Sequence, residues 1–265
     1  MNKVISKDGT EIAYEKQGAG PAVILVDGAL CYRSFGPMPN LAKLLAPHFT
    51  VYMYDRRGRG ESTNSKPYAV EREVEDIEAL IQEAGGKAYV FGTSSGGCLA
   101  LEAAIRLGDK CEKLALYEAP YNSDEASQPE WKEYRKQLEE LLKAGRRGDA
   151  AALFMKFVGA PADQVEGMRQ APMWPLFESV APTLAYDAAV MGEDRAVPVK
   201  RAANVKVPAL VMDGGANLVF LPFMHATASA LAKAIPHAKR HTLEGQTHDV
   251  NVEVLAPVLS EFFSQ

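Results

Sequence analysis

Cysteine is scarce in this chain, whose 265 residues include only Cys31, Cys98 and Cys111. The number is odd and no C-x-x-C spacing occurs, so the pattern favours neither a disulfide framework nor a zinc site. We therefore expect three buried or partly buried thiols and no metal centre.

Long apolar runs and an excess of basic residues are also missing. No stretch reaches the roughly 18 apolar residues that a membrane-spanning helix requires. The N-terminal stretch MNKVISKDGTEIAYEKQG lacks the apolar core of a signal peptide, which predicts a cytoplasmic protein. With 29 Lys and Arg against 34 Asp and Glu, the net charge is −5, and neither nucleic acid nor an anionic membrane is an expected partner. We expect a small-molecule substrate, and the composition leaves the oligomeric state open.

The chain does contain a regular succession of short strands and helices. Asp8-Gly9 separates two alternating segments, a pattern typical of a β-hairpin. Runs that are apolar at every position predict strands covered on both faces of a parallel sheet, and they lie at 22–26, 50–54, 88–92, 113–117 and 209–213. Helical patterns lie at 70–84, 96–107 and 222–235. This alternation predicts a doubly wound α/β domain.

The segment 122–200 interrupts this alternation. It is helical in pattern, is punctuated by Pro and Gly, and contains no good strand. We interpret it as a helical cap over the strand ends, because ligands bind at the carboxyl edge of such sheets. Residues 1–121 and 201–265 then form the core domain.

The stretch GTSSG at 92–96 matches G-x-S-x-G between an apolar strand and a helical segment. In such an elbow the flanking glycines let the backbone turn sharply and expose the hydroxyl of a nucleophilic serine, here Ser94. The alternative is a Gly-rich turn that holds a phosphate at a helix N-terminus. No Walker lysine and no full G-x-G-x-x-G accompany the turn, which favours the serine elbow.

Three separated motifs resemble those of the α/β-hydrolases: YDRRGRGES at 54–62, GTSSGG at the elbow and GQTHDV at 245–250. A more particular resemblance is to capped bacterial hydrolases that carry YDRRGRG, LYE and LEGQTHDV. The resemblance implies an eight-stranded, mostly parallel sheet with helices on both faces, a helical cap, and Ser, acid and His on loops at the carboxyl edge. We interpret the arginine-rich motif as a turn stabilised by Asp55, Arg57 and Gly58, not as a phosphate site.

Among the five histidines, His248 matches the catalytic position of the family. A serine hydroxyl is a poor nucleophile until a base such as histidine takes its proton. The other four are interpreted as structural or solvent-facing, because each lacks an evident catalytic partner: His48, His225, His237 and His241.

The acid that should orient this histidine departs from the commonest family pattern. The usual position falls on or near Asn217, which cannot carry a charge. Glu118 ends the strand before the predicted cap, and some α/β-hydrolases and haloalkane dehalogenases carry their acid there. The chain order Ser94, Glu118, His248 also matches the order of the fold. Asp213, at the end of its own strand, is the second choice.

An oxyanion hole needs two N–H donors. By position these are Ser95, directly after the nucleophile, and Ala29 in the loop after the strand 22–26. In the family this loop commonly reads His-Gly-x. Here Asp27 replaces the histidine, while Gly28 still permits close approach of the backbone.

Substrate-pocket residues are expected beside this loop and in the cap, at Gly28, Cys31, Tyr32, Met173, Trp174 and Phe177. For the cap cluster, packing inside the cap is an equal alternative.

Together these residues predict hydrolysis of a carboxylic ester or lactone of a small to medium, fairly apolar substrate through an acyl-enzyme on Ser94. No metal or organic cofactor is needed. The same scaffold also supports carbon–carbon bond hydrolysis, thioester hydrolysis and cofactor-free peroxide chemistry. A catalytically weak small-molecule binding protein is the non-enzymatic alternative, which Asn217 and Asp27 would suit.

Overall fold

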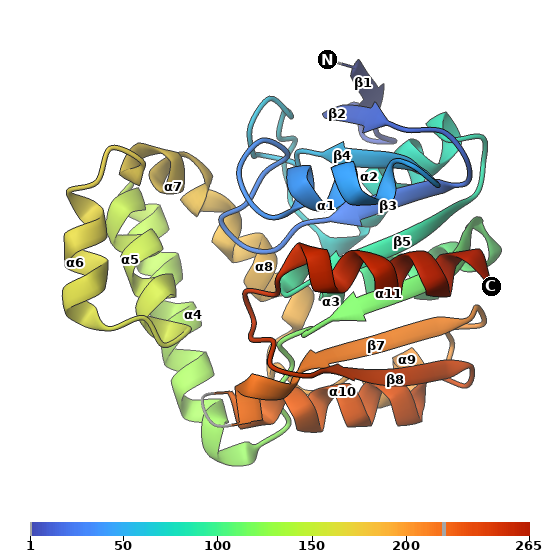
Figure 1. The fold of residues 1–265 in the computed structure, drawn as a ribbon. Helices are drawn as coiled ribbons and strands as arrows, with labels where there is room; N and C mark the ends of the chain where they lie inside the picture. The colour runs from blue at the N-terminus through green and yellow to red at the C-terminus, as the bar shows by residue number, and fades with distance from the viewer. Residues whose placement is uncertain (1, 219–220) are drawn as a thin grey trace.

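The computed structural model describes residues 2–218 and 221–265. An eight-stranded sheet in the order β1-β2-β4-β3-β5-β6-β7-β8 forms its centre (Figure 1). β1–β2 and β2–β4 are antiparallel and every other neighbouring pair is parallel, which confirms the mostly parallel sheet. The strands are β1 Asn2–Ile5, β2 Glu11–Gln17, β3 Ala22–Val26, β4 Thr50–Tyr54, β5 Ala88–Thr93, β6 Cys111–Tyr117, β7 Ala209–Gly214 and β8 Ala238–Leu243.

The apolar runs of the sequence form the inner strands because both faces of those strands are covered. β7 is buried at all of its 6 positions. Along β3, Val23 and Leu25 join one core cluster while Ile24 and Val26 join the other, as the alternation of a strand requires. β8 lies at the sheet edge, and its mostly exposed sequence AKRHTL lacks the apolar run.

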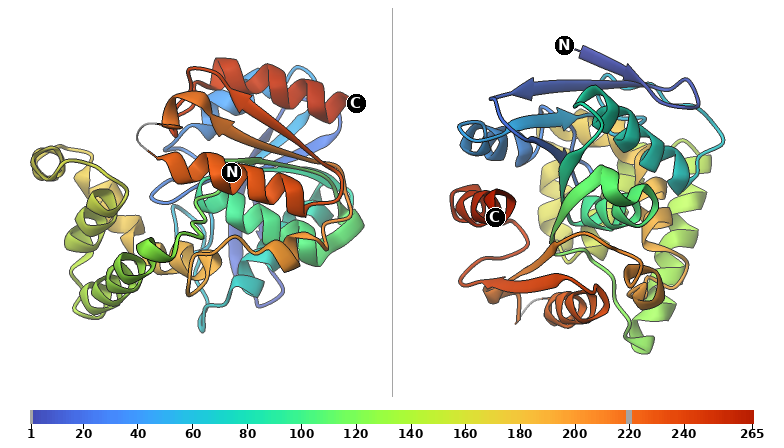
Figure 2. Two further views of the ribbon diagram at one scale, coloured as in Figure 1. Left: turned by 90° about the horizontal axis from the view of Figure 1, so that it is seen from below. Right: turned by 90° about the vertical axis from the view of Figure 1, so that its right-hand side faces the viewer.

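Helices cover both faces of the sheet (Figure 2). α1 (Met38–Leu45) and α11 (Val252–Ser264) pack against each other over one face. α2 (Val70–Glu83), α3 (Ser95–Leu107) and α10 (Pro222–Ala234) share the core of the other face. This arrangement confirms the α/β fold and places the carboxyl ends of the parallel strands at one edge.

A helical insertion connects β6 to β7. Its described residues contain no strand, and Figure 1 shows α4 to α7 standing beside the sheet with α8 next to the core. Its elements are η2 (Glu125–Ser127), α4 (Gln128–Lys143), α5 (Arg147–Phe157), α6 (Ala162–Arg169), α7 (Trp174–Val180), η3 (Ala181–Thr183), α8 (Leu184–Met191) and α9 (Val199–Ala202). Two short 3₁₀ helices lie outside it, η1 (Gly108–Lys110) and η4 (Gly215–Leu218). Within the described ranges, no helix has both the length and the apolarity to cross a membrane.

Candidate active site

Ser94 lies on a strained turn between β5 and α3. Its φ of 54° and ψ of −134° fall where residues other than glycine are uncommon. The chain can turn here because of its glycines: a Cβ on Gly92 would lie 2.3 Å from the Gly96 carbonyl oxygen, and one on Gly96 would lie 2.3 Å from the Val26 carbonyl oxygen. The glycines of GTSSG are therefore required by close backbone packing, and Ser94 is raised at the strand end.

Glu118 follows β6 at the same edge and contacts His248. Its Oε2 lies 2.7 Å from His248 Nδ1, and its Oε1 accepts a hydrogen bond of 2.8 Å from the Gly214 N–H. The carboxylate is buried, whereas the imidazole is 32% exposed. With Nδ1 facing the carboxylate, the other imidazole nitrogen, Nε2, is left to face a substrate or a nucleophile.

The turn that carries His248 is held by two neighbouring strands. The Tyr117 hydroxyl at the end of β6 donates to the Thr247 carbonyl oxygen at 2.5 Å. A Cβ on Gly214, at the end of β7, would lie 2.4 Å from the Gln246 carbonyl oxygen, so only glycine fits. Sequence reasoning did not find Tyr117 or Gly214 as supports of the histidine turn. The tyrosine in the LYE motif, at a strand end, was the available signal.

Asp213, the second choice for the acid, contacts a different histidine. Its buried carboxylate lies 2.8 Å from His225 Nδ1 and accepts hydrogen bonds of 3.1 Å from Arg240 and from Thr242. His225, interpreted from the sequence as structural or solvent-facing, is thus paired with a buried acid, because α10 brings it onto the end of β7. The side chain of Asn217 lies outside the described part of the structure.

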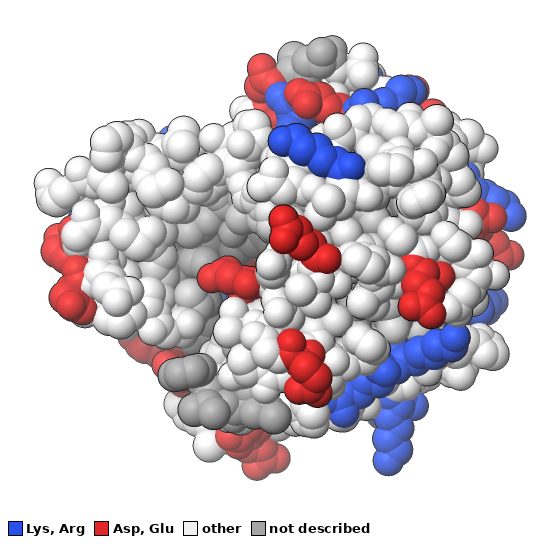
Figure 3. All heavy atoms as spheres, viewed as in Figure 1, with Lys and Arg blue, Asp and Glu red and all other residues white. Residues whose placement is uncertain are grey.

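Two cavities open beside Ser94 and His248, with volumes of about 360 Å³ and 430 Å³. Both are lined by Ala29, Ser94 and His248, and by Phe154 and Val158 from the α5 region of the insertion. Figure 3 shows the surface hollowed between the insertion and the sheet domain. Ser94 and His248 thus line both cavities and lie where the two cavities adjoin.

The loop after β3 brings further predicted residues to this junction. A Cβ on Gly28 would lie 3.0 Å from the Ser94 Cβ, so the loop passes directly beside Ser94. Gly28 and Cys31 line the smaller cavity. Ser95 begins α3, so its N–H has no acceptor within the helix and lies at the positive end of the helix dipole.

Four of the predicted pocket residues lie in the lining of neither cavity. Tyr32 stacks on Phe35, with ring centroids 5.7 Å apart, and Phe177 meets the same ring edge-on at 5.4 Å. Trp174 is buried and packs against Phe177, whereas Met173 is 41% exposed. Trp174 thus packs against another residue of the insertion, whereas Phe177 also contacts Phe35 of the core domain.

The arginines of YDRRGRGES are buried and paired with carboxylates. Arg57 donates to Asp76 at 2.7 and 2.8 Å and to Asp8 at 2.8 Å. Asp55 accepts from the Arg33 and Glu61 backbone N–H groups at 2.8 and 2.9 Å and so organises the turn. These contacts agree with a structural role of the motif and leave no arginine for a phosphate.

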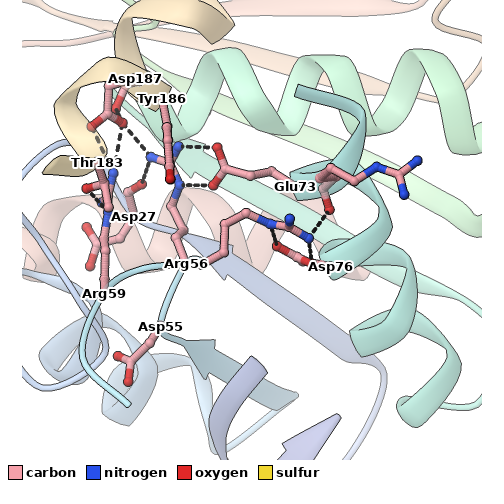
Figure 4. Close-up of polar contacts among 12 residues, drawn as sticks. Asp27, Asp55, Arg56, Arg59, Glu73, Asp76, Thr183, Tyr186 and Asp187 are labelled. Carbon is pink, nitrogen blue, oxygen red and sulfur yellow. Dashed lines mark hydrogen bonds and ion pairs between the residues drawn. The ribbon is translucent and has the colours of Figure 1, made fainter. Parts of the chain in front are cut away.

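Two of these arginines reach the loop after β3 (Figure 4). Arg59 donates to both oxygens of Asp187 on α8, at 2.8 and 2.9 Å. It also donates to the carbonyl oxygens of Gly28 and Cys31. Arg56 donates to Asp187 at 2.6 Å and forms a two-pronged pair with Glu73 at 2.8 and 2.9 Å. The insertion therefore braces the loop after β3 through Asp187 and Arg59.

Asp187 also accepts a hydrogen bond of 2.7 Å from the Ser95 hydroxyl. Burial raises the pKa of Asp187, but Arg59 and Arg56 outweigh it, and the pKa lies below its ordinary value. For Asp27 the balance is the reverse, and burial raises its pKa to about 7. Arg59 and a 3.1 Å hydrogen bond from the Gly28 N–H act in the opposite direction but do not outweigh burial. A buried network of charged side chains therefore supports the site. Its link to α8, through Asp187, was not predicted from the sequence motifs.

Within residues 2–218 and 221–265, no group of three or more His, Cys, Asp and Glu side chains is arranged to hold a metal ion.

Comparison with known proteins agrees with this fold. The model of the alpha/beta hydrolase family matches residues 18–259, so the chain belongs to that family. The crystal structure of an alpha/beta hydrolase from Sphaerobacter thermophilus DSM 20745 is 51% identical, with a TM-score of 0.88 over 99% of this chain and 100% of that chain. A thermophilic esterase from Thermogutta terrifontis shares the fold at 24% identity, with a TM-score of 0.73 over 99% of this chain and 97% of that chain.

A curated relative, the uncharacterized hydrolase YraK of Bacillus subtilis (strain 168), is 32% identical over 121 residues. The match spans 44% of this chain and 44% of that relative, so it covers less than half of the relative's length.

Proposed function

We propose that this chain is a serine hydrolase that cleaves a carboxylic ester or lactone of a small to medium, largely apolar substrate. The observation that supports this proposal most directly is the position of His248. Its Nδ1 lies 2.7 Å from the buried Glu118 carboxylate, and its side chain lines the same two cavities as the strained Ser94. A histidine oriented by a carboxylate and a serine that lines the same cavity are the groups that activate a hydroxyl for attack.

The first half-reaction forms an acyl-enzyme. Glu118 keeps the proton of the imidazole on Nδ1, so Nε2 of His248 accepts the proton of the Ser94 hydroxyl as Oγ attacks the carbonyl carbon. The carbonyl electron pair moves onto oxygen, and the N–H groups of Ala29 and Ser95 stabilise the resulting oxyanion. As the tetrahedral intermediate collapses, His248 gives its proton to the leaving alcohol oxygen.

The second half-reaction restores the enzyme. His248 takes a proton from water as the water oxygen attacks the acyl carbon, and the same N–H pair stabilises the second oxyanion. The bond to Ser94 Oγ breaks, the serine takes the proton back, and the carboxylic acid leaves.

The helical segment 122–200 acts as the cap of this site, and residues 1–121 and 201–265 supply the catalytic groups. Phe154 and Val158 support this division, because they line both cavities from the α5 region. The smaller cavity is otherwise walled largely by apolar side chains such as Met38, Leu41 and Phe91, which favour an apolar substrate part.

The test is hydrolysis of p-nitrophenyl acetate and butyrate together with labelling by a fluorophosphonate, which phosphonylates an activated serine with loss of fluoride. We expect the wild type to turn over and to be labelled, and Ser94→Ala to lose both. Ser179→Ala removes an exposed hydroxyl of the insertion and is the matched control. A wild type that is inert toward every ester and is not labelled would contradict the proposal.

A further inference from the structure

The larger of the two cavities beside Ser94 is lined by a positively charged side chain that the proposed mechanism does not use. Arg195 follows α8 and lines this cavity together with Ser94 and His248. Its φ of 52° lies in the left-handed region, and its carbonyl oxygen accepts a hydrogen bond of 2.7 Å from the Asn122 N–H. The loop therefore holds Arg195 at the cavity in a backbone conformation that an arginine rarely adopts.

The guanidinium is surrounded by aromatic rings. Its carbon lies 5.5 Å from the Trp131 ring centroid, 5.3 Å from that of Phe157 and 5.0 Å from that of Phe223. Its Nε donates to the Pro120 carbonyl oxygen at 2.6 Å. The rings and this bond fix the plane of the guanidinium, so its remaining N–H groups are pre-organised.

No carboxylate in the described ranges forms an ion pair with Arg195, and no described residue accepts a hydrogen bond from its Nη1 or Nη2. This differs from Arg56, Arg57 and Arg59, which are all paired with carboxylates. Burial lowers the pKa of Arg195, which reflects the cost of a charge kept away from water. An arginine remains charged nonetheless, so an anion that entered the cavity would find two nitrogens, Nη1 and Nη2, with unused N–H groups.

Other charged groups of the cavity wall do not occupy these donors. Asp187 is already engaged by two arginines. Glu130 and Asp249 are exposed, so water screens their repulsion of an anion. Glu130 acts on Arg195 through space without an ion pair.

We propose that Arg195 binds a carboxylate of the substrate, so that the ester or lactone cleaved at Ser94 carries an anionic group. This inference rests on the proposed function and narrows it to monoanionic substrates with an apolar body. The planar guanidinium suits a carboxylate because two parallel N–H donors match its two oxygens.

The experiment compares kcat/KM within two pairs of esters that differ in one charge. In the first pair the acyl part carries it: mono-p-nitrophenyl adipate against p-nitrophenyl 6-methylheptanoate, whose isopropyl end has the shape of a carboxylate. In the second pair the leaving group carries it: 4-acetoxybenzoate against its methyl ester. We expect the wild type to prefer the anionic member of at least one pair. In Arg195→Met that ratio should fall roughly 10- to 100-fold, the range of a charge-assisted hydrogen bond.

Variants separate a binding role from a structural one. Arg195→Lys keeps the charge without the planar donors and should restore part of the ratio. Arg135→Met removes a charge of the same insertion outside both cavity linings and should leave the ratio unchanged. Glu130→Gln should change the ratio little, because water screens the charge of this exposed carboxylate. Equal losses for both members of each pair in Arg195→Met, or a wild-type preference for the neutral members, would overturn the proposal.

A binding measurement keeps this result apart from failure of the proposed function. Calorimetric titration of Ser94→Ala with monomethyl adipate and with dimethyl adipate needs no turnover. We expect the anion to bind more tightly, and Ser94→Ala/Arg195→Met to lose that preference. Equal affinity for the two compounds in Ser94→Ala would overturn the anion site even if ester hydrolysis is observed.

Discussion

Exchanging Glu118 for glutamine tests the acid assignment with almost no change of shape. In the wild type one carboxylate oxygen accepts from the Gly214 N–H at 2.8 Å and the other lies 2.7 Å from His248 Nδ1. A glutamine has only one oxygen, and the Gly214 N–H requires an acceptor. The amide NH₂ is therefore directed at His248 Nδ1, which must then accept a hydrogen bond.

The consequence is the wrong tautomer of the imidazole. With Nδ1 as acceptor, the proton lies on Nε2, which can no longer take the proton of Ser94. The stabilisation of the imidazolium by a carboxylate is lost as well. Loss of both functions costs on the order of 10⁴ in rate, or about 5.4 kcal/mol of transition-state stabilisation. Because volume and the Gly214 bond are kept, the free energy of unfolding should change by less than about 1 kcal/mol.

The assay is p-nitrophenyl butyrate hydrolysis per folded protein, with urea unfolding measured on the same samples. Asp213→Asn is the matched control, since it neutralises a buried acid at the end of the adjacent strand that contacts His225 and not His248. We expect Asp213→Asn to stay within a few-fold of wild type. A Glu118→Gln variant that keeps more than a tenth of the activity, beside an inactive Asp213→Asn, would refute the assignment.

Three further predictions concern the structure around the site. Asp187→Asn leaves two buried arginines short of a negative charge and should lower the free energy of unfolding by about 3 kcal/mol in urea titrations; an unchanged midpoint would contradict this. Burial raises the pKa of Asp27 from 3.8 to about 7, so its contribution to stability is full below pH 3.8 and is lost as pH rises through 7. Between pH 5 and pH 8 the wild type should therefore lose roughly 2 to 4 kcal/mol relative to Asp27→Asn, and parallel pH profiles would show that the carboxyl is not perturbed. Gly96→Ala puts a Cβ 2.3 Å from a carbonyl oxygen and should abolish activity or soluble expression, whereas Gly167→Ala, with open space around it in α6, should be neutral or slightly stabilising.

The sheet could be predicted because its inner strands coincide with short apolar runs in the sequence. Runs such as 22–26 and 50–54 coincide with β3 and β4, since strands buried on both faces are apolar at every position. The edge strand β8 has no such run, because one of its sides meets water. Loops that follow inner strands could be placed for the same reason, and Ser94 and Glu118 follow the inner strands β5 and β6. His248 follows the edge strand β8 and was placed by the resemblance of its motif alone.

The cap residues could not be placed, because amphipathic periodicity does not say which neighbour an apolar face meets. Trp174 packs against Phe177, which also meets Phe35 of the core domain, while Phe154 and Val158, equally apolar, line the cavities. The buried charge pairs were also beyond the sequence. Asp187 lies 131 positions from Arg56 along the chain, and only the fold brings their side chains to 2.6 Å.

The position of the acid follows from the order of the strands. β6 and β7 are parallel neighbours, so residues at their carboxyl ends lie side by side at the same edge of the sheet. An acid from either strand end is therefore close to the histidine turn. In this chain the end of β7 gives a backbone donor, the Gly214 N–H, while its own acid, Asp213, is held by Arg240 and His225. The carboxylate that is left to contact His248 comes from β6. The same geometry implies that moving the acid to β7 in this protein requires a new carboxylate beyond Gly214 and the loss of the Glu118 charge, because two carboxylates on one imidazole would repel each other.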